Sequence, residues 1–442
     1  MHAARIASVC LLCLLCNLGQ ALAVGQPVKV VLPNGLTVLI SEGNGSGVVA
    51  IAAMVKVSAL DEPLESLGIR NFAHQVIARG SAQYDGGQIT TALEGVGGKL
   101  DLSVSTDYAE MQAVTLCDGF ELSLGFIADL LRRPRFDAHE TESVRVGILS
   151  QLAASSADDI DTAYGAFKRT LYADTPYAWE VLGKAEVVRM LTREQLNAFH
   201  SRYYLPNNTV LAIVGGLPAE RVLGAVMRHF SDWERQSLPE RLMPSLAALS
   251  LGRMITLETS HRERTVMVGF PAPAAGASDF APMSALNSLL GSGMGSRLFR
   301  EVRERVGLAY HATSIYPTLL GPGHLVAYAS TDPARLTAVR EAILHEFARL
   351  QQEPVTEAEL DAAKRFLIGN NARAHSHNRG QAYYLAWYEA LGVGYEFDSQ
   401  YPALIQRVTA QDMMRVANRY LRLPVIVNTG TPAKGEKPKS RE

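Results

Sequence analysis

The sequence predicts an α+β protein built from two homologous domains, each a mixed sheet packed by helices. Segments 186–216 and 403–430 repeat one order of features: an apolar pair, a threonine, an amphipathic helix, Arg-Tyr, Leu-Pro and a β-run. Thr192 and Arg202 in the first segment match Thr409 and Arg419 in the second at a constant spacing. Such a repeat indicates a duplicated domain. The chain has 442 residues, 48% of them hydrophobic, which is enough for two sizeable cores.

Both halves open with β-structure. Two β-runs in segment 28–40 flank Asn34-Gly35, a dipeptide that favours a hairpin turn, and a further strand is expected over 48–57. In the second half, segments 254–259 and 264–273 have the same apolar, β-branched character. We therefore expect each domain to begin with neighbouring strands.

Each half continues with a strand and an amphipathic helix. Strands are expected over 108–116 and 324–330. The helices after them place apolar residues at i, i+3, i+4 and i+7 spacings, which is typical of a core-facing surface. These residues are Phe120, Leu124, Ile127 and Leu131 in the first half and Leu336, Val339, Ile343 and Phe347 in the second. Asp332-Pro333 predicts a helix start, and an acidic helix is expected to follow near His139 and near Thr356.

The N-terminus has the form of an export signal. Arg5 precedes an apolar run over 6–15 and then Ala21-Leu22-Ala23, an A-x-A cleavage pattern. We predict a signal peptide over 1–23, a first domain over 24–235, a linker over 236–253, a second domain over 254–431 and a disordered tail over 432–442. The mature protein is expected in the periplasm. No later stretch is long and apolar enough to predict a membrane span.

Charge and cysteine content narrow the function classes further. The formal net charge is −2, from 42 basic and 44 acidic residues, which does not favour a nucleic-acid partner. Cys10, Cys13 and Cys16 have a spacing that suits a metal or a cluster, but they fall within the expected signal peptide. Cleavage leaves Cys117 alone, so no intrachain disulfide is expected.

Four motifs, in this order, resemble the pitrilysin/insulinase family, which includes the mitochondrial processing peptidases. They are the Asn-Gly hairpin, the GIRNF helix that begins near Gly68, the LTREQL…RYYLPNN segment, and GSRLFREVRERVGLAY in the second half. The resemblance covers essentially the whole mature chain. It implies two domains of the processing-peptidase type that form half of a clamshell, with zinc in one half of the clamshell and an Arg/Tyr pair in the other.

Active members of that family have an H-x-x-E-H helix and a further Glu about 76 residues later. The corresponding positions here are Asn71, His74 and Gln75 in GIRNFAHQVIARG, and then Gln151. Amide oxygens are poor ligands for Zn²⁺, which prefers imidazole, thiolate and carboxylate. We predict no zinc in this chain. His74 is expected to pack or hydrogen-bond in a cleft without metal, and His375 and His377 are expected on a solvated surface.

In the second half the resemblance implies retained functional residues. Active relatives use an Arg and a Tyr seven residues apart to hold substrate and stabilise an oxyanion, and Arg303 and Tyr310 match them. The LLGSGMGSRLF segment lacks the context of a dinucleotide site. It is similar to the glycine-rich loop of a non-catalytic processing-peptidase subunit, and Ser296 is expected to cap the next helix.

A substrate strand is also implied in the first half. Segment 97–112 is similar to the family's edge strand, which pairs with extended peptides by β-augmentation. Its polar residues are Asp101, Ser103 and Ser105, and Asp101 stands where active members usually have Asn.

The leading hypothesis is a non-catalytic subunit that pairs with a separate H-x-x-E-H chain to form a periplasmic zinc peptidase acting on extended peptides or unfolded proteins. The metal would belong to the partner alone. The alternative is a proteolytically inert scaffold or binding protein of the same fold. An autonomous hydrolase using His74 is a third hypothesis, disfavoured because no nucleophile or charged partner stands beside that histidine.

Overall fold

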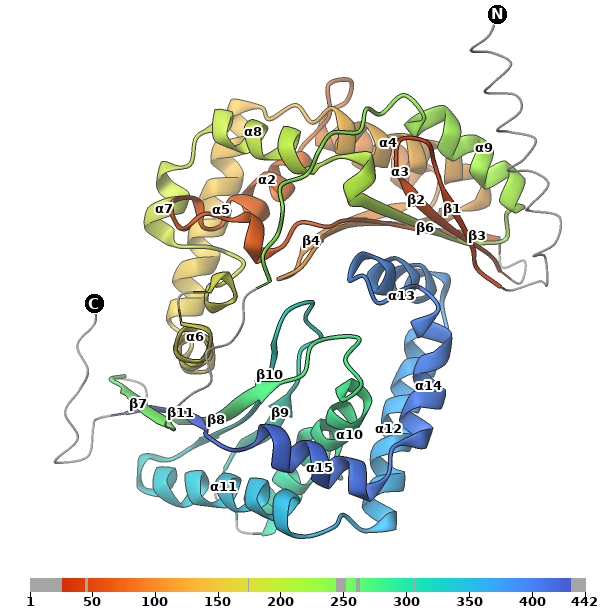
Figure 1. Cartoon of the computed structure of the whole chain (residues 1–442). Helices are drawn as coiled ribbons and strands as arrows, with labels where there is room; N and C mark the ends of the chain where they lie inside the picture. The colour runs from red at the N-terminus through yellow and green to blue at the C-terminus, as the bar shows by residue number, and fades with distance from the viewer. Residues whose placement is uncertain are drawn as a thin grey trace, which may run out of the picture.

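The structure is a computed structural model that describes residues 26–43, 47–173, 175–243, 252–259, 263–305, 307 and 309–430. The expected signal peptide and tail lie outside the described residues, as do residues 244–251 of the expected linker. The chain forms two sheet-and-helix halves that lie one above the other (Figure 1). No helix in the described part of the chain is long and apolar enough to cross a membrane.

The first half is built on a six-stranded mixed sheet with strand order β1-β2-β6-β3-β5-β4. Its strands are β1 (Val28–Val31), β2 (Thr37–Glu42), β3 (Val48–Val55), β4 (Lys99–Val104), β5 (Ala109–Leu116) and β6 (Thr209–Gly215). The predicted hairpin is confirmed: β1 pairs antiparallel with β2, and Gly35 in the turn has a φ of 89°, which favours glycine.

The second half repeats this topology in five strands, ordered β7-β11-β8-β10-β9. They are β7 (Arg253–Leu257), β8 (Arg264–Ala272), β9 (His311–Ile315), β10 (Gly323–Thr331) and β11 (Val425–Thr429). In both halves the last strand lies inside the sheet between a parallel and an antiparallel neighbour. These neighbours are β2 and β3 for β6, and β7 and β8 for β11. The predicted α+β fold with two duplicated mixed sheets is confirmed.

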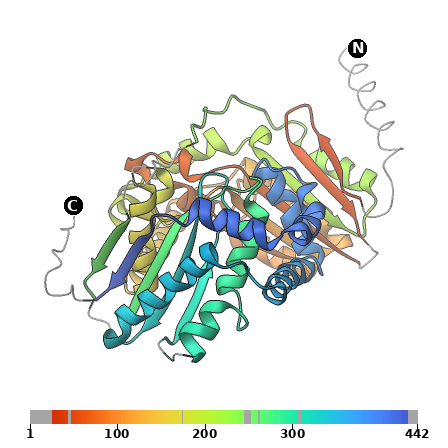
Figure 2. The same cartoon turned by 60° about the horizontal axis from the view of Figure 1, so that its bottom comes forward.

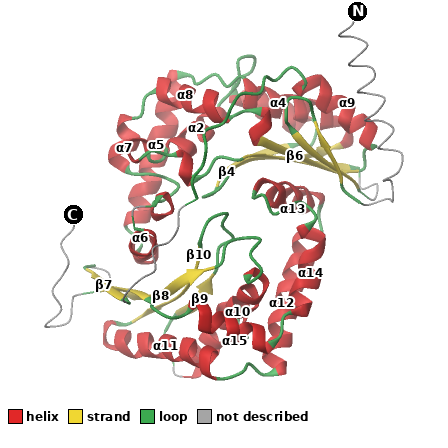
Figure 3. Cartoon of the chain, viewed as in Figure 1, coloured by secondary structure: helices red, strands yellow, loops and turns green. Residues whose placement is uncertain are grey.

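Helices cover the outer face of each sheet (Figure 3). In the first half these are α2 (Ile69–Ile77), α3 (Gly86–Gly95), α4 (Phe120–Arg132), α5 (Ala138–Ser156), α7 (Ala185–Met190), α8 (Arg193–Tyr203) and α9 (Ala219–Phe230). In the second they are α10 (Phe280–Gly291), α11 (Leu336–Gln352), α12 (Glu357–Ala374), α14 (Phe397–Arg407) and α15 (Ala410–Tyr420). Figure 2 shows α11 and α15 in front of the second sheet. The predicted apolar faces of α4 and α11 are buried in the two cores.

The repeated threonines have a local structural role. Thr192 accepts a hydrogen bond from the backbone N–H of Gln195, and Thr409 does the same for Asp412. The side chains of Gln195 and Asp412 return a bond to the threonine N–H, which closes a capping box at the start of α8 and of α15. The duplicated sequence therefore starts the same helix in both halves.

The inner face of each sheet is covered by a helix from the other half of the sequence. Helix α6 (Asp159–Tyr172) packs on β8 and β11, whereas α13 (Asn378–Ala390) packs on β3 and β6. Buried His324 of β10 ties α6 to the second sheet, with its ring nitrogens 2.7 Å from the hydroxyls of Tyr164 and Tyr172. This reciprocal packing was not predicted from the sequence, because the amphipathic pattern of a helix does not say which sheet it covers.

Candidate functional site

The four positions of the altered zinc motif line one open cavity of about 480 Å³ in the first half. Asn71, His74 and Gln75 come from α2, where positions i and i+4 share a face. Gln151 comes from α5, and residues 100–104 of β4 form the opposite wall. The structure therefore brings together residues that the sequence separates by about 76 positions.

The cavity carries amide chemistry at the positions where the family has zinc ligands. The Gln75 Nε2 donates a hydrogen bond of 3.0 Å to the Asn71 Oδ1, so that oxygen is already engaged. The buried Asn71 Nδ2 has no partner among the described residues, and Gln151 is exposed. Neutral amides lack the charge and softness that a tetrahedral zinc site requires. These residues do not fit the family's metal.

His74 is fully packed into the first half. Its Nδ1 lies 2.8 Å from the Tyr204 hydroxyl and its Nε2 lies 2.8 Å from the Glu110 carbonyl oxygen. Because a carbonyl only accepts, the Nε2 carries the proton and the Nδ1 accepts from Tyr204. Burial lowers the pKa of His74 to about 4. A neutral imidazole with both nitrogens occupied is neither a free base nor a free metal ligand.

The predicted substrate strand is β4, which forms one edge of the first sheet. Asp101 pairs with Lys99 Nζ at 2.7 Å and with Nη2 of Arg379, from α13, at 2.9 Å. The Ser103 hydroxyl donates to a carboxylate oxygen of Glu110 at 3.1 Å. Ser105 lies just past the end of β4, and its N–H donates to the carbonyl of Tyr108. The outer edge of β4 therefore runs beside the amide cavity, with its polar side chains held by neighbours.

Arg303 and Tyr310 lie in the second half and neither lines the amide cavity. Arg303 is exposed, in the helical segment Phe299–Arg305, with its guanidinium 4.8 Å from the Phe299 ring centroid. Tyr310 is 55% exposed and directly precedes β9; its hydroxyl donates to Asp332 at 3.1 Å, and that carboxylate raises the pKa of Tyr310. Both are available to an external partner.

These two residues lie at the end of β9 that faces away from the first half. The opposite end of β9 leads into the turn 316–322, where Asp107 of the first half accepts hydrogen bonds from the Leu320 N–H at 2.8 Å and from the Tyr177 hydroxyl at 2.6 Å. The Arg/Tyr pair and the Asp107 contact therefore lie at opposite ends of β9, separated by the length of that strand.

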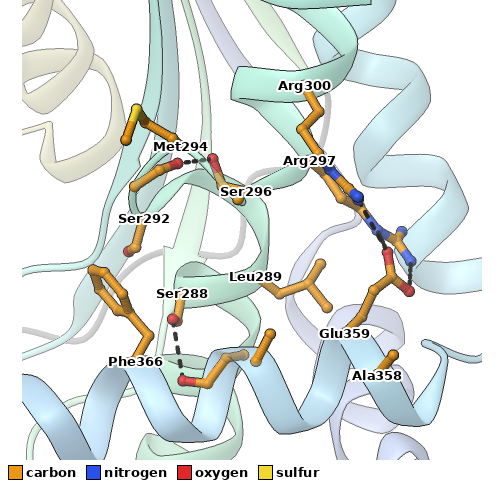
Figure 4. A pocket seen from close by; sticks show the side chains of 14 residues that line it. Ser288, Leu289, Ser292, Met294, Ser296, Arg297, Arg300, Ala358, Glu359 and Phe366 are labelled. Carbon is orange, nitrogen blue, oxygen red and sulfur yellow. Dashed lines mark hydrogen bonds and ion pairs between the residues drawn. The ribbon is translucent and has the colours of Figure 1, made fainter.

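The glycine-rich loop borders a second pocket, of about 330 Å³, between α10 and α12 (Figure 4). The Ser296 carbonyl accepts from the Arg300 N–H, as at a helix start, but the Ser296 hydroxyl donates back to the Gly293 carbonyl at 2.7 Å. The predicted side-chain cap is therefore not formed. Arg297 makes a two-pronged ion pair with Glu359, with bonds of 2.8 and 3.0 Å. This neutralised arginine gives no support to a phosphate site.

Sequence reasoning missed the partners that immobilise His74. Tyr204 is buried at the end of α8, and only its place in the RYYLPNN segment marked it. The Glu110 carbonyl could not be predicted from the sequence, because every residue has a backbone carbonyl. Among the described residues, no group of three or more His, Cys, Asp or Glu side chains gathers as a metal site.

Comparison with known proteins agrees with this geometry. Residues 37–185 match the family profile described as insulinase (peptidase family M16), and residues 190–367 match the peptidase M16 inactive domain. An uncharacterised zinc protease of Mycobacterium leprae is 29% identical over 345 residues, covering 77% of each chain. One of Rickettsia felis is 25% identical over 395 residues, covering 88% of this chain and 93% of the relative.

Solved structures show the same fold. A protease from Helicobacter pylori aligns with a TM-score of 0.87 and 22% identity, over 92% of this chain and 100% of the other. A peptidase M16 inactive domain from Pseudomonas fluorescens aligns with a TM-score of 0.84 and 22% identity, over 93% and 100%. The two duplicated α+β domains, with a helix at the position of the inverted zinc motif, place this chain in the class of metallopeptidase-like proteins. Within it, this chain belongs to the M16 peptidase family, also called the insulinase or pitrilysin family.

Proposed function

We propose that this chain is a non-catalytic, substrate-binding subunit of a heteromeric zinc peptidase of the periplasm. A partner chain of the same family, with an intact H-x-x-E-H helix, would carry the metal. The observation that carries the proposal is a contrast within the chain: the cavity at the zinc position holds neutral amides, whereas Arg303 and Tyr310 stand exposed on the other half. A guanidinium and a phenol are suitable donors for a developing oxyanion in a partner's site.

The β4 edge supports a proposal for the substrate class. An edge strand offers unpaired backbone N–H and C=O groups to an extended peptide, whatever its sequence. Extended peptides or unfolded proteins are therefore the proposed substrates. This chain would hold them, and the bond-breaking chemistry would take place on the partner.

The test is co-expression with an exported H-x-x-E-H relative, followed by zinc analysis and peptide cleavage. We expect the isolated chain to hold no zinc and cleave nothing. In the complex, Arg303→Ala or Tyr310→Phe should lower kcat by roughly a hundredfold, as the loss of an oxyanion donor does, without changing zinc content. Arg300→Ala is the matched control, because this arginine lies one helical turn earlier and is also exposed. Stoichiometric zinc in the isolated chain would overturn the proposal.

The alternative, an inert scaffold or binding protein, has one observation in its favour. Both residues already have intramolecular partners, since Tyr310 donates to Asp332 and Arg303 lies over Phe299. If the complex forms but cleaves equally well with both residues replaced, the scaffold function is the better description.

A further inference from the structure

A third pocket, of about 210 Å³, is lined by residues 280–401 of the second half of the chain. Helices α10 and α12 form one side, and α13, which lies on the first sheet, forms another. By element order, α10 and α12 are the duplicates of α2 and α5, which form the amide cavity. The second half thus has its own pocket where the first half has the altered zinc site.

The walls of this pocket are mostly rings. The six aromatic residues that line it are Phe280, Tyr316, Tyr384, Trp387, Tyr388 and Tyr401. They hold one another in place: the Tyr384 and Trp387 ring centroids are 5.7 Å apart at 72°, and those of Phe280 and Tyr316 are 5.7 Å apart at 46°. We call this the aromatic pocket. Fixed rings form a binding surface that loses little side-chain entropy when a ligand enters.

Several neutral polar groups in the aromatic pocket are unused. The hydroxyls of Tyr384, Tyr388 and Tyr401 and the side-chain amide of Asn371 have no hydrogen-bond partner among the described residues, in contrast with the Tyr316 hydroxyl, which donates to Pro273 at 2.7 Å. Burial raises the pKa of Tyr388, so its hydroxyl stays protonated. No charged side chain is among the described residues that line the pocket. This neutral lining favours an uncharged ligand with both an apolar ring and a hydrogen-bonding edge.

We propose that the aromatic pocket binds one aromatic side chain of a peptide, with Asn371 and the free tyrosine hydroxyls bonding the adjacent peptide group. The volume is below the roughly 300–1,000 Å³ of pockets that hold drug-sized ligands, so it suits a single ring. Ring-to-ring contacts add attraction beyond that of the buried apolar area. The peptide nature of the ligand rests on the proposed function.

Helix α13 links the aromatic pocket to the substrate edge. Its first turn carries Arg379, which pairs with Asp101 of β4, and Tyr388 follows nine positions later in the same helix. Nine helical residues span about 13 Å, the length of about four residues of extended chain. A peptide that pairs with β4 thus needs only a short extension to bring a side chain level with the pocket.

The chain supplies its own reporter for a binding test. It has three tryptophans, Trp179, Trp233 and Trp387, and only Trp387 lines the aromatic pocket. The full mature chain is titrated with N-acetyl-phenylalaninamide, N-acetyl-leucinamide and methyl glucoside while tryptophan fluorescence and heat are recorded. We expect saturable binding of the phenylalanine probe, at least tenfold weaker binding of the leucine probe, and no binding of the sugar.

Variants assign the signal to the pocket. Trp387→Phe should abolish the fluorescence change and, because it shortens one ring wall, weaken the binding measured by heat about threefold, whereas Trp179→Phe, outside the pocket, should leave both unchanged. Tyr388→Leu should weaken binding at least tenfold. Tyr388→Phe keeps the ring and removes only the hydroxyl, so it is the variant less prone to misfold. It should weaken binding of the phenylalanine probe about threefold. Tyr84→Leu, at a 42% exposed tyrosine outside the pocket, is the control.

Three results would overturn the proposal: no binding of the phenylalanine probe, binding unaffected by Tyr388→Leu, or saturable binding of the sugar in its place. The outcome is separable from that of the proposed function, because the probe is tested on the isolated chain. If activity of the complex depends on Arg303 but the isolated chain does not bind the phenylalanine probe, only the pocket proposal is rejected. If the isolated chain binds the phenylalanine probe but cleavage by the complex does not depend on Arg303, only the proposed role in the peptidase is rejected.

Discussion

The two halves of this protein share one frame and differ in the residues placed at equivalent positions. In both, a central last strand and a capping-box helix repeat in the same order. Between α2 and α5 the first half has amides and a locked histidine, whereas the second half has, beside α10 and α12, fixed rings and unused hydroxyls that come mainly from α13 and α14. The frame is therefore maintained by its cores and caps, which leaves the residues of each cleft free to take up different chemistry.

The largest expected effect comes from reversing this difference in the first half. The triple variant Asn71→His, Gln75→His and Gln151→Glu places two imidazoles and a carboxylate around the amide cavity. These are strong zinc ligands at positions that already line one cavity. We expect zinc affinity to rise at least a thousandfold, about 4 kcal/mol, measured by calorimetric titration with zinc.

The double variant that keeps Gln151 is the control for this restoration. It should bind zinc at least tenfold more weakly than the triple variant, because one of three protein ligands stays neutral. A triple variant that folds but gains no zinc affinity would show that the cavity geometry, and not only its side chains, has departed from a metal site.

Acid stability offers the next comparison, since each half has a buried neutral histidine. Burial lowers the pKa of His74 to about 4 and that of His324 to about 3. Because the folded pKa lies below the unfolded value near 6.5, the unfolded state takes up protons first as pH falls. Each contribution is full above pH 6.5 and is lost progressively down to the folded pKa, about 4 for His74 and about 3 for His324. The loss is about 2 kcal/mol per histidine at pH 5.

Urea unfolding at pH 7 and pH 5 measures this loss. In His324→Phe the difference between the two pH values should shrink by about 2 kcal/mol, although the variant is less stable overall because Tyr164 loses its partner and Tyr172 keeps only the Pro322 carbonyl. His377→Phe, at a histidine outside both buried networks, should leave the difference unchanged. An equal pH response in wild type and His324→Phe would contradict a neutral buried His324.

Much of the fold was predictable because its signals are local. Asn34-Gly35, the threonine caps and the helical apolar spacings act over a few residues. The predicted cluster of Asn71, Gln75 and Gln151 followed from the family resemblance, and the structure places them in one cavity. The exchange of α6 and α13 between halves and the locking of His74 by Tyr204 depend on contacts between distant segments, for which one sequence holds no local mark.

A smaller effect is expected where α12 meets α14. The Nδ1 of His375 lies 2.7 Å from the Asn371 carbonyl and its Nε2 lies 2.8 Å from Asp398, so both nitrogens face acceptors. Its pKa is raised by Asp398 and the Asn371 carbonyl, which together outweigh the lowering effect of burial. A raised folded pKa means that this contribution is full below pH 6.5 and fades as pH rises through the folded pKa.

Asp398→Asn should therefore cost about 1 kcal/mol at pH 6 and less at pH 9, in the opposite sense to the buried histidines. Urea midpoints across that range check it, with Asp361→Asn, an exposed carboxylate on α12, as the control. A cost that is the same at both pH values would mean that His375 is not charged in the folded protein.

The smallest effect tests the bridge between the halves at the substrate edge. Asp101 is about one-third exposed and Arg379 about half exposed, so their 2.9 Å pair is well screened by water. Arg379 is also held by its bond to Gln112 at 2.6 Å, which keeps it in place if Asp101 changes. A double-mutant cycle of Asp101→Asn with Arg379→Gln should give a coupling of about 0.5 kcal/mol that falls with added salt. The parallel cycle of Asp101 with the more exposed Lys99 should give a smaller coupling energy.

A coupling energy above about 2 kcal/mol between Asp101 and Arg379 would be outside the range of screened pairs. It would mean that this contact, rather than the exchange of α6 and α13, decides how the two halves sit together.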